Sequence, residues 1–363
     1  MKLLTGDPRR KAAIVLAVAF LTLCLLTVVG CGNGTGKSET NSQPATNDGT
    51  TWTNTNGGVS SYSIYSLAYD SGHKLLYAGT ESGVWEYDGT TWTDTGGGVS
   101  SCLLYSLAYD SAHKVLYAGT VGGQGVFKYD GTTWTSTGVG VPSYNIESLA
   151  YDSGHNLLYA GCSNKDDNGH GVWKYDGTTW TNTNGGVSSY SIPSLAYDSG
   201  HELLYAGCYD SSTKTGKGVW KYDGTTWTNP NGGVSSYSIP SLAYDSKHNV
   251  LYVGTAGGGV WKYDGTTWTN TNGGVSSYLI GSLAYDSGHN LLYAGCKDPS
   301  GASTGKGVWK YDGTTWTDTG EGVSSYEIYS LAYDPGHNLL YAGCEDPSGA
   351  STGKGVWKYN SSK

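Results

Sequence analysis

The sequence predicts an all-β protein built from seven repeated four-stranded units, and three observations support this fold class. One unit recurs seven times from Asp48 onward, at a mean spacing of about 44 residues. Each unit contains short stretches in which apolar and polar residues alternate, separated by Asp-Gly and Gly-rich turns. No stretch within the units has the period of a helix. The repeat length is that of one β-propeller blade, so residues 48–363 are expected to form a seven-bladed β-propeller of four-stranded antiparallel blades.

Three motifs define the unit. The first is Asp-Gly-Thr-Thr-Trp-Thr, whose tryptophans are Trp52, Trp92, Trp134, Trp180, Trp227, Trp268 and Trp316. The second is Ser-Leu-Ala-Tyr-Asp, whose leucines are Leu67, Leu107, Leu149, Leu195, Leu242, Leu283 and Leu331. The third is Gly-Val-Trp, whose tryptophans are Trp85, Trp173, Trp220, Trp261, Trp309 and Trp357, with Phe127 in place of a seventh. Because every motif occurs seven times, seven blades are expected.

The first complete unit shows the expected strands in order. Residues 64–69 alternate as the innermost strand, and a polar turn leads to a second strand at residues 75–79. Residues 84–87 form the third strand, and a tight Asp-Gly turn leads to an outer strand around Trp92. The core of such blades must consist largely of tryptophan and tyrosine, because the chain has 13 Trp and 31 Tyr but only 2 Phe.

The two ends of the repeat region predict how the ring closes. The chain enters at an outer-strand motif, residues 50–53, and the last unit stops after a third strand, residues 356–359. The last blade therefore lacks an outer strand of its own, which the N-terminal segment can supply. Such a closure pairs strand edges that an open array would leave exposed. We predict a propeller closed by its N-terminal outer strand.

Three stretches carry a resemblance to known propeller families. Residues 330–334 read Ser-Leu-Ala-Tyr-Asp, residues 340–343 read Leu-Tyr-Ala-Gly, and residues 308–316 read Val-Trp-Lys-Tyr-Asp-Gly-Thr-Thr-Trp. Residues 48–359 resemble the Asp-box, two-component-regulator and WD- or YVTN-like propeller repeats of exported bacterial proteins. An Asp-box has one more residue between its Asp and Gly than this chain has, so the subfamily stays open. Because such families differ in function, the resemblance implies a fold and no particular activity.

The first thirty residues have the features of an export signal. Three basic residues, 9–11, precede an apolar run, residues 12–29, which is followed by a glycine and Cys31. This junction resembles a bacterial lipobox, which implies cleavage before Cys31 and attachment of a lipid to its sulfur. Residues 1–30 would then be a lipoprotein signal peptide and residues 31–47 a flexible tether. A transmembrane helix over the same run is the alternative, because eighteen apolar residues nearly span a bilayer.

The charge distribution excludes several classes of partner. Both arginines of the chain, Arg9 and Arg10, lie in the N-terminal segment. The formal net charge is −9, and it becomes −12 without residues 1–30, which carry a net +3. An acidic body without arginine lacks the counterion-releasing surface that binds nucleic acids, and it lacks the guanidinium group that sialidase-like sites require. We expect no nucleic-acid partner.

Cysteine and histidine recur at fixed positions of the unit. Besides Cys102, four cysteines occupy a position where three other units have threonine: Cys162, Cys208, Cys296 and Cys344. Seven histidines occupy the turn after the innermost strand: His73, His113, His155, His201, His248, His289 and His337. Equivalent positions of successive blades are too far apart for a disulfide or a shared metal ion. We interpret the cysteines as small buried side chains and the histidines as turn residues fixed by nearby aspartates, and we expect no metal and no cofactor.

Positions that differ between otherwise similar copies indicate a site. The first variable position, where the innermost strand starts, is Ser63, Leu103, Asn145, Ser191, Ser238, Leu279 and Glu327. The second, two residues later, is Tyr65, Tyr105, Glu147, Pro193, Pro240, Gly281 and Tyr329. The loop between the second and third strands also varies, and it is long only in the four units with cysteine. In a propeller these positions share one face around the mouth of the central channel, where they indicate ligand contact or, alternatively, drift in unconstrained loops.

The chemistry at the second variable position suggests a binding site. Tyr65, Tyr105 and Tyr329 fall in neighbouring blades once the ring closes, with Glu147 and Glu327 beside them. Aromatic faces stack on sugars and peptides, while carboxylates accept their hydrogen bonds. We expect a monomeric, non-enzymatic binding module, lipid-anchored outside the cytoplasm to the cell membrane or outer membrane, with a glycan or an extracytoplasmic protein as partner. The alternatives are a glycan hydrolase or lyase whose acids are Glu147 and Glu327, and an adhesion scaffold without a small ligand.

Overall fold

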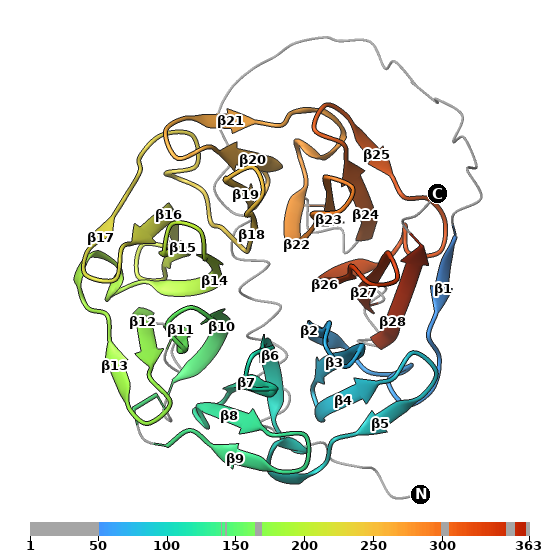
Figure 1. The fold of residues 1–363 in the computed structure, drawn as a ribbon. Coiled ribbons are helices and arrows are strands. Elements are labelled where there is room, and N and C mark those ends of the chain that lie inside the picture. Colours follow the sequence, from blue (N-terminus) through green and yellow to red (C-terminus); the bar gives the residue numbers. More distant parts are fainter. Residues whose placement is uncertain are drawn as a thin grey trace, which may run out of the picture.

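A computed structural model describes residues 51–360, apart from residues 139, 142–143, 164–168, 299–304 and 346–352. Within this part of the chain, seven four-stranded antiparallel sheets form the blades of a β-propeller (Figure 1). The blades follow one another around a central axis, and each runs from an innermost strand to a short outer strand at the rim. The predicted fold class is confirmed. The predicted signal peptide and tether lie outside the described residues.

Every blade contains one strand of each rank. The innermost strands are β2 (Ile64–Asp70), β6 (Leu103–Asp110), β10 (Asn145–Asp152), β14 (Ser191–Asp198), β18 (Ser241–Asp245), β22 (Leu279–Asp286) and β26 (Glu327–Asp334). The second strands are β3 (Leu75–Thr80), β7 (Val115–Val121), β11 (Leu157–Ser163), β15 (Leu203–Asp210), β19 (Val250–Gly254), β23 (Leu291–Lys297) and β27 (Leu339–Glu345). The third strands are β4 (Gly83–Tyr87), β8 (Val126–Tyr129), β12 (Gly169–Tyr175), β16 (Thr215–Tyr222), β20 (Val260–Tyr263), β24 (Gly305–Tyr311) and β28 (Gly353–Asn360). The outer strands are β5 (Trp92–Asp94), β9 (Trp134–Ser136), β13 (Trp180–Asn182), β17 (Trp227–Thr228), β21 (Trp268–Asn270), β25 (Trp316–Asp318) and β1 (Trp52–Asn54). We number the blades 1 to 7 in the order of their innermost strands.

The ring closes through the N-terminal strand. β1 pairs antiparallel with β28, which places Trp52 opposite Tyr359 (Figure 1). The sheet order β1-β28-β27-β26 thus completes blade 7 with a strand from the other end of the chain. Trp52 is only 5% exposed, so the closing strand contributes a buried aromatic side chain as well as backbone hydrogen bonds. The predicted closure is confirmed.

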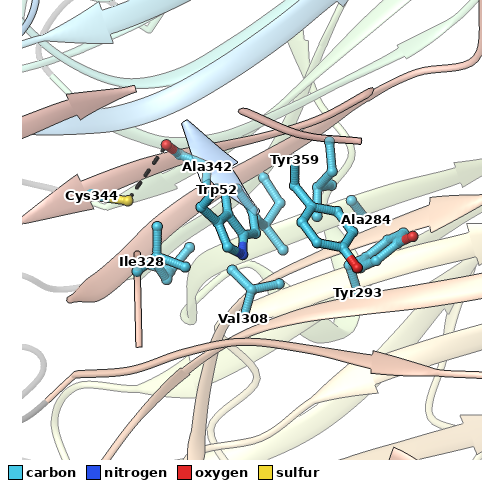
Figure 2. Close-up of a cluster of buried hydrophobic side chains, with 11 residues drawn as sticks. Trp52, Ala284, Tyr293, Val308, Ile328, Ala342, Cys344 and Tyr359 are labelled. Carbon is cyan, nitrogen blue, oxygen red and sulfur yellow. Dashed lines mark hydrogen bonds between the residues drawn. The ribbon is translucent and has the colours of Figure 1, made fainter. Parts of the chain in front are cut away.

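The hydrophobic core of the described residues lies between the blades. Each cluster of buried side chains joins two neighbouring sheets, and the cluster at the closure is shown in Figure 2. There Val308 of blade 6 packs with Ile328 of blade 7 and with Trp52 of the closing strand. Blade-to-blade burial of this kind explains why both faces of every sheet carry apolar or aromatic residues.

Serine side chains tie the innermost strands together. The hydroxyl of Ser66 accepts a hydrogen bond from the backbone N–H of Leu107 in the next blade, at 2.9 Å. An equivalent serine contacts the next blade's backbone at every junction, and at the closure Ser330 accepts from the N–H of Leu67 at 2.9 Å. These buried polar groups are therefore satisfied across the blade interfaces rather than within the blades.

Tryptophan side chains tie the outer strands together. The indole N–H of Trp180 donates to the hydroxyl of Thr137 in the preceding blade at 3.0 Å, and Trp52 donates to Thr319 at 2.9 Å across the closure. The same contact forms at six of the seven junctions. At the seventh, Pro230 replaces the threonine, and the buried indole N–H of Trp268 has no hydrogen-bond partner.

A third recurring contact lies within the turn after each innermost strand. The ring nitrogen Nδ1 of each repeated histidine lies 2.6–2.8 Å from the carboxylate of the aspartate three residues before it, which confirms the predicted turn role. The hydroxyl of Tyr109 in the next blade also lies close to the Asp70 carboxylate, where it favours the charged form of Asp70. Burial alone would raise the pKa of Asp70, but the bonds from Tyr109 and His73 hold it below its usual value.

The alternation of threonine and cysteine in the second strands follows loop length. Thr80 donates its hydroxyl to the carbonyl of Gly83 at 2.9 Å, which closes a short connection to the third strand, and Thr120 and Thr255 do the same in their blades. In the long-loop blades the equivalent thiol, such as that of Cys344, instead faces the carbonyl of Ala342 at 3.6 Å (Figure 2). The cysteines of the described residues are free and buried, as the sequence predicts.

Candidate functional site

The second variable position of the unit lies in a β-bulge. The pairing of innermost and second strands skips a register between Ile64 and Ser66, and equivalent irregularities occur in blades 2, 3, 4, 6 and 7. In blade 5, Pro240 directly precedes the innermost strand β18. A bulged residue forms no regular ladder bond and its side chain is turned away from the sheet. This position therefore tolerates tyrosine, glutamate, proline or glycine.

A third variable position, which sequence reasoning missed, lies beside the first. Cross-strand pairing sets Glu327 opposite Glu345 and Leu279 opposite Lys297, so the ends of the second strands flank the starts of the innermost strands. The residues are Glu81, Val121, Ser163, Tyr209, Ala256, Lys297 and Glu345. They directly follow the threonine or cysteine position, and they differ in nearly every copy. That variability is the signal that would have identified them. We call the end of the propeller that carries all three positions the variable face.

The three predicted tyrosines form one cluster on the variable face. The rings of Tyr65 and Tyr105 are 5.3 Å apart between centroids, and those of Tyr65 and Tyr329 are 6.0 Å apart. All three side chains are half-buried because they pack on one another. The cluster therefore fills the part of the axis beside blades 7, 1 and 2, rather than presenting three separate flat surfaces.

Carboxylates surround this cluster. Lys297 forms an ion pair with Glu327 at 2.7 Å, and the hydroxyl of Tyr329 donates to the same Glu327 oxygen at 3.2 Å. Burial raises the pKa of Tyr329, and the negative charges of Glu345 and Glu327 raise it further. Burial and the charge of Glu327 also raise the pKa of Glu345. The part of the variable face beside blades 7 and 1 therefore has an excess of negative charge, which Lys297 compensates only in part.

Glu147 lies apart from this group. It belongs to blade 3, and its carboxylate accepts a hydrogen bond from the hydroxyl of Ser163 in the same blade at 2.5 Å. Blade 3 is not adjacent to blade 7, so the structure does not bring Glu147 together with Glu327 as a pair. The five predicted site residues belong to four successive blades, 7, 1, 2 and 3, with Glu147 at one end of that row and Glu327 at the other.

A cavity occupies the part of the variable face where the bulge residues are small. Its volume is about 180 Å³. It is lined by Pro193, Pro240 and Gly281 of blades 4, 5 and 6, and by Tyr329 of blade 7. Ser238, Ala256, Leu279, Lys297, Glu327 and Ile328 complete the lining. The tyrosine cluster and the cavity therefore involve different bulge positions of the ring and share Tyr329.

The cavity places the sequence-predicted residues in two groups. Glu327 and Tyr329 form part of its wall, whereas Tyr65, Tyr105 and Glu147 are not among its lining residues. The sequence associated the site with the aromatic half of the ring, but the open space lies beside the prolines and the glycine. Lys297, Leu279 and Ala256 are lining residues that the sequence analysis did not single out.

Metal-binding clusters and membrane-spanning helices are both absent from the part of the chain that the structure describes. No group of three or more histidine, cysteine, aspartate or glutamate side chains in this part of the chain could hold a metal ion. Among the same residues, no helix has the length and apolar character needed to cross a membrane.

The comparisons with known proteins give the fold and no family. No family model matches the sequence, and no curated protein matches it. The extracellular domain of a putative hybrid two-component system from B. thetaiotaomicron is similar at a TM-score of 0.64 and 18% identity, over 86% of this chain and 39% of that one. A GH74 xyloglucanase from Xanthomonas campestris gives 0.61 and 16%, over 85% of this chain and 53% of that one.

A third neighbour is matched over nearly its whole length. The WD40 repeats of RRP9 give a TM-score of 0.59 and 14% identity, over 85% of this chain and 97% of that one. The chain thus spans less than two thirds of the first two neighbours. At these identities the similarity supports one conclusion, that the described chain has the architecture of a seven-bladed β-propeller.

Proposed function

We propose that the protein is an extracytoplasmic, lipid-anchored binding module that recognises a glycan or a segment of another protein through the cavity on the variable face. The observation that carries the proposal is the position of this cavity. It opens where the near-identity of the blades breaks down, and four of its lining residues occupy the bulge position of four successive blades. Pockets with apolar walls and a few convergent polar groups are the usual sites of ligand binding.

The size of the cavity limits what it can hold. A volume of about 180 Å³ is below that of pockets for drug-sized molecules, which begin at roughly 300 Å³. The cavity can therefore take one sugar ring or one amino-acid side chain, presented by a larger partner that rests on the surrounding face. The extracytoplasmic location rests on the lipobox at Cys31, and it is supported by the extracellular origin of one structural neighbour.

A binding screen with a cavity-filling variant tests the proposal. The full-length protein is screened against glycan and secreted-protein arrays, alongside Pro240→Tyr. Three other blades carry tyrosine at this bulge position, so the variant is compatible with the fold. Ser199→Tyr is the control, because Ser199 is exposed in the turn that follows β14, the innermost strand of neighbouring blade 4, at the end of the propeller opposite the variable face. Binding that Pro240→Tyr abolishes and Ser199→Tyr preserves supports the proposal, and ligands that bind both variants equally contradict it.

A glycan hydrolase or lyase is the second candidate, and one pair of residues favours it. Glu327 and Glu345 are direct cross-strand partners, and such residues have Cβ atoms about 4.5–5.5 Å apart. One carboxylate is ion-paired to Lys297, while the pKa of the other is raised by burial and by its neighbour. A carboxylate beside a carboxylic acid is the arrangement that glycoside hydrolysis uses. Turnover of aryl glycosides that Glu345→Gln removes would support this candidate, and absence of turnover over a broad substrate panel would leave binding alone.

A further inference from the structure

The cavity is lined by two kinds of side chain, which we call its apolar wall and its polar wall. Pro193, Pro240, Ala256, Leu279 and Ile328 supply the apolar wall, and Lys297, Glu327 and Tyr329 supply the polar one. Hydroxyl groups of a sugar ring placed against the apolar wall would lose their hydrogen bonds to water without replacement, which is costly. A ligand with a hydrocarbon stem and one polar end matches both walls.

The charges of the variable face select the sign of that polar end. Its three variable positions carry four carboxylates, Glu81, Glu147, Glu327 and Glu345, and one ammonium group, Lys297. Three of the four carboxylates lie at blades 7 and 1, beside the polar wall of the cavity. Fields of this kind attract cations and repel anionic groups such as carboxylates and phosphates. Burial raises the pKa of Glu345, and the negative charges of Glu327 and Glu81 raise it further.

The polar wall can also satisfy a cation locally. Glu327 is 6% exposed, and both Glu327 and Tyr329 line the cavity. A buried ammonium group needs a carboxylate partner, and it gains further from the face of a nearby aromatic ring. We infer that the cavity binds the side chain of a lysine from a partner protein, with the methylene stem against the prolines and Leu279 and the ammonium group at the Glu327 carboxylate, beside Tyr329. This rests on the proposed function, because it names the ligand class of the same cavity.

Lys297 has a defined place in this interaction. Its ammonium group already lies 2.7 Å from Glu327, so it occupies one carboxylate oxygen in the absence of a partner. An incoming ammonium group must share Glu327 with Lys297 or displace it. Removing the charge of Lys297 is therefore expected to strengthen the binding of a cation and to weaken the binding of an anion.

A series of small probes with one stem and three end groups tests the inference. Pentylamine, pentanol and pentanoate are titrated into the full-length protein and followed by ligand-observed NMR, with Nα-acetyl-lysine amide as a peptide-like probe. Pentylamine should bind about tenfold more tightly than pentanol or pentanoate, and Nα-acetyl-lysine amide should bind at least as tightly as pentylamine. Glu327→Gln should weaken the amines about tenfold, and Lys297→Met should tighten them severalfold. Lys262→Met is the control for loss of one positive charge away from the cavity.

The outcomes separate this inference from the proposed function. Preference for the amines that Pro240→Tyr abolishes supports both. Equal binding of pentanol and pentylamine, again abolished by Pro240→Tyr, keeps the cavity as a binding site and overturns the lysine inference. Tighter binding of pentanoate, or weaker amine binding in Lys297→Met, also overturns it. If none of the probes binds, the lysine inference is wrong, and the array screen with Pro240→Tyr decides the proposed function separately. Should Glu327→Gln fail to fold, Glu345→Gln and Lys297→Met keep the charge argument testable.

Discussion

Pro230→Thr should stabilise the propeller by repairing one of its seven outer junctions. At the six other junctions a threonine follows the outer strand, and it accepts the indole N–H of the next blade's tryptophan. In blade 4 proline stands in that position and the indole N–H of Trp268 is buried without a partner. The outer strand β17 is also one residue shorter than the six others. Proline has no backbone N–H, and this explains the early end of the strand.

The magnitude follows from the bonds that threonine forms elsewhere. Thr183 donates its backbone N–H to the carbonyl of Val172 at 3.0 Å and its hydroxyl to the same carbonyl at 2.8 Å, and it accepts the N–H of Trp227 at 3.1 Å. A net gain of about 0.5–1.5 kcal/mol for each bond is opposed by about 0.4–1 kcal/mol for the lost rigidity of proline. The free energy of unfolding should therefore rise by about 0.5–4 kcal/mol, and Tm by about 1–6 °C for a domain of this size.

Calorimetry on the two proteins measures this change, and the reciprocal variant checks its cause. Thr183→Pro should lower Tm by a similar amount, because it removes the same three bonds from the neighbouring junction. The indole N–H signal of Trp268 should in addition exchange more slowly with solvent in Pro230→Thr. An unchanged or lower Tm in Pro230→Thr would refute the argument that the missing threonine bonds weaken this junction. A neutral effect of Thr183→Pro would refute the value assigned to the bonds themselves.

Three further predictions concern the ends of the chain and its acid stability. Cys31→Ser should leave a larger, unprocessed precursor in the cell, and unchanged mass and membrane fractionation would contradict the lipobox. Deletion of residues 48–56 should lower thermal stability and solubility, because it exposes the edge of β28 and removes Trp52. Burial of such a tryptophan contributes roughly 2–3 kcal/mol to the free energy of unfolding. An unaltered melting curve would contradict ring closure by β1. The free energy of unfolding should be constant above about pH 4 and fall toward pH 2. The backbone N–H of Thr315 and the hydroxyl of Thr314 lower the pKa of Asp312 in the folded protein to about 2. Such a carboxylate contributes its full stabilisation above its pKa in the unfolded chain and loses it as the pH falls toward its pKa in the folded protein. Five equivalent aspartates share this shift, and a flat profile down to pH 2 would contradict it.

The fold could be predicted because each level of the sequence points to the same structure. Seven copies of three motifs fix the number of blades, and the missing outer strand of the last copy fixes the closure by residues near Trp52. The ties between blades were only partly accessible. The aspartate beside each histidine was predicted from proximity in sequence, whereas the bond from Trp180 to Thr137 joins residues of different blades and needs the geometry of the ring.

The sequence predicts which end of the propeller carries the variable positions, but it does not predict the shape of the surface there. Variation at the start of the innermost strands predicted that Tyr65, Tyr105 and Tyr329 lie in neighbouring blades at one end of the propeller, and their rings are in contact there. Sequence could not show that the tyrosines would fill space rather than border it, because that depends on a bulge whose register shift leaves no pattern in a single strand. For the same reason the sequence does not predict the cavity beside Pro193 and Pro240, because only the arrangement of the blades shows that small side chains leave an opening there.

Stability and recognition use different positions of one repeat, and the bulge is what separates them. The serine, tryptophan–threonine and aspartate–histidine ties occupy positions that stay nearly constant, and each joins a blade to its neighbour or fixes its turn. The bulge residue takes part in none of these ties and in no regular ladder bond. A change from tyrosine to proline or glycine there alters the space around the axis and leaves every tie in place. A propeller of nearly identical blades can therefore acquire a one-sided cavity without losing any of the contacts that close the ring.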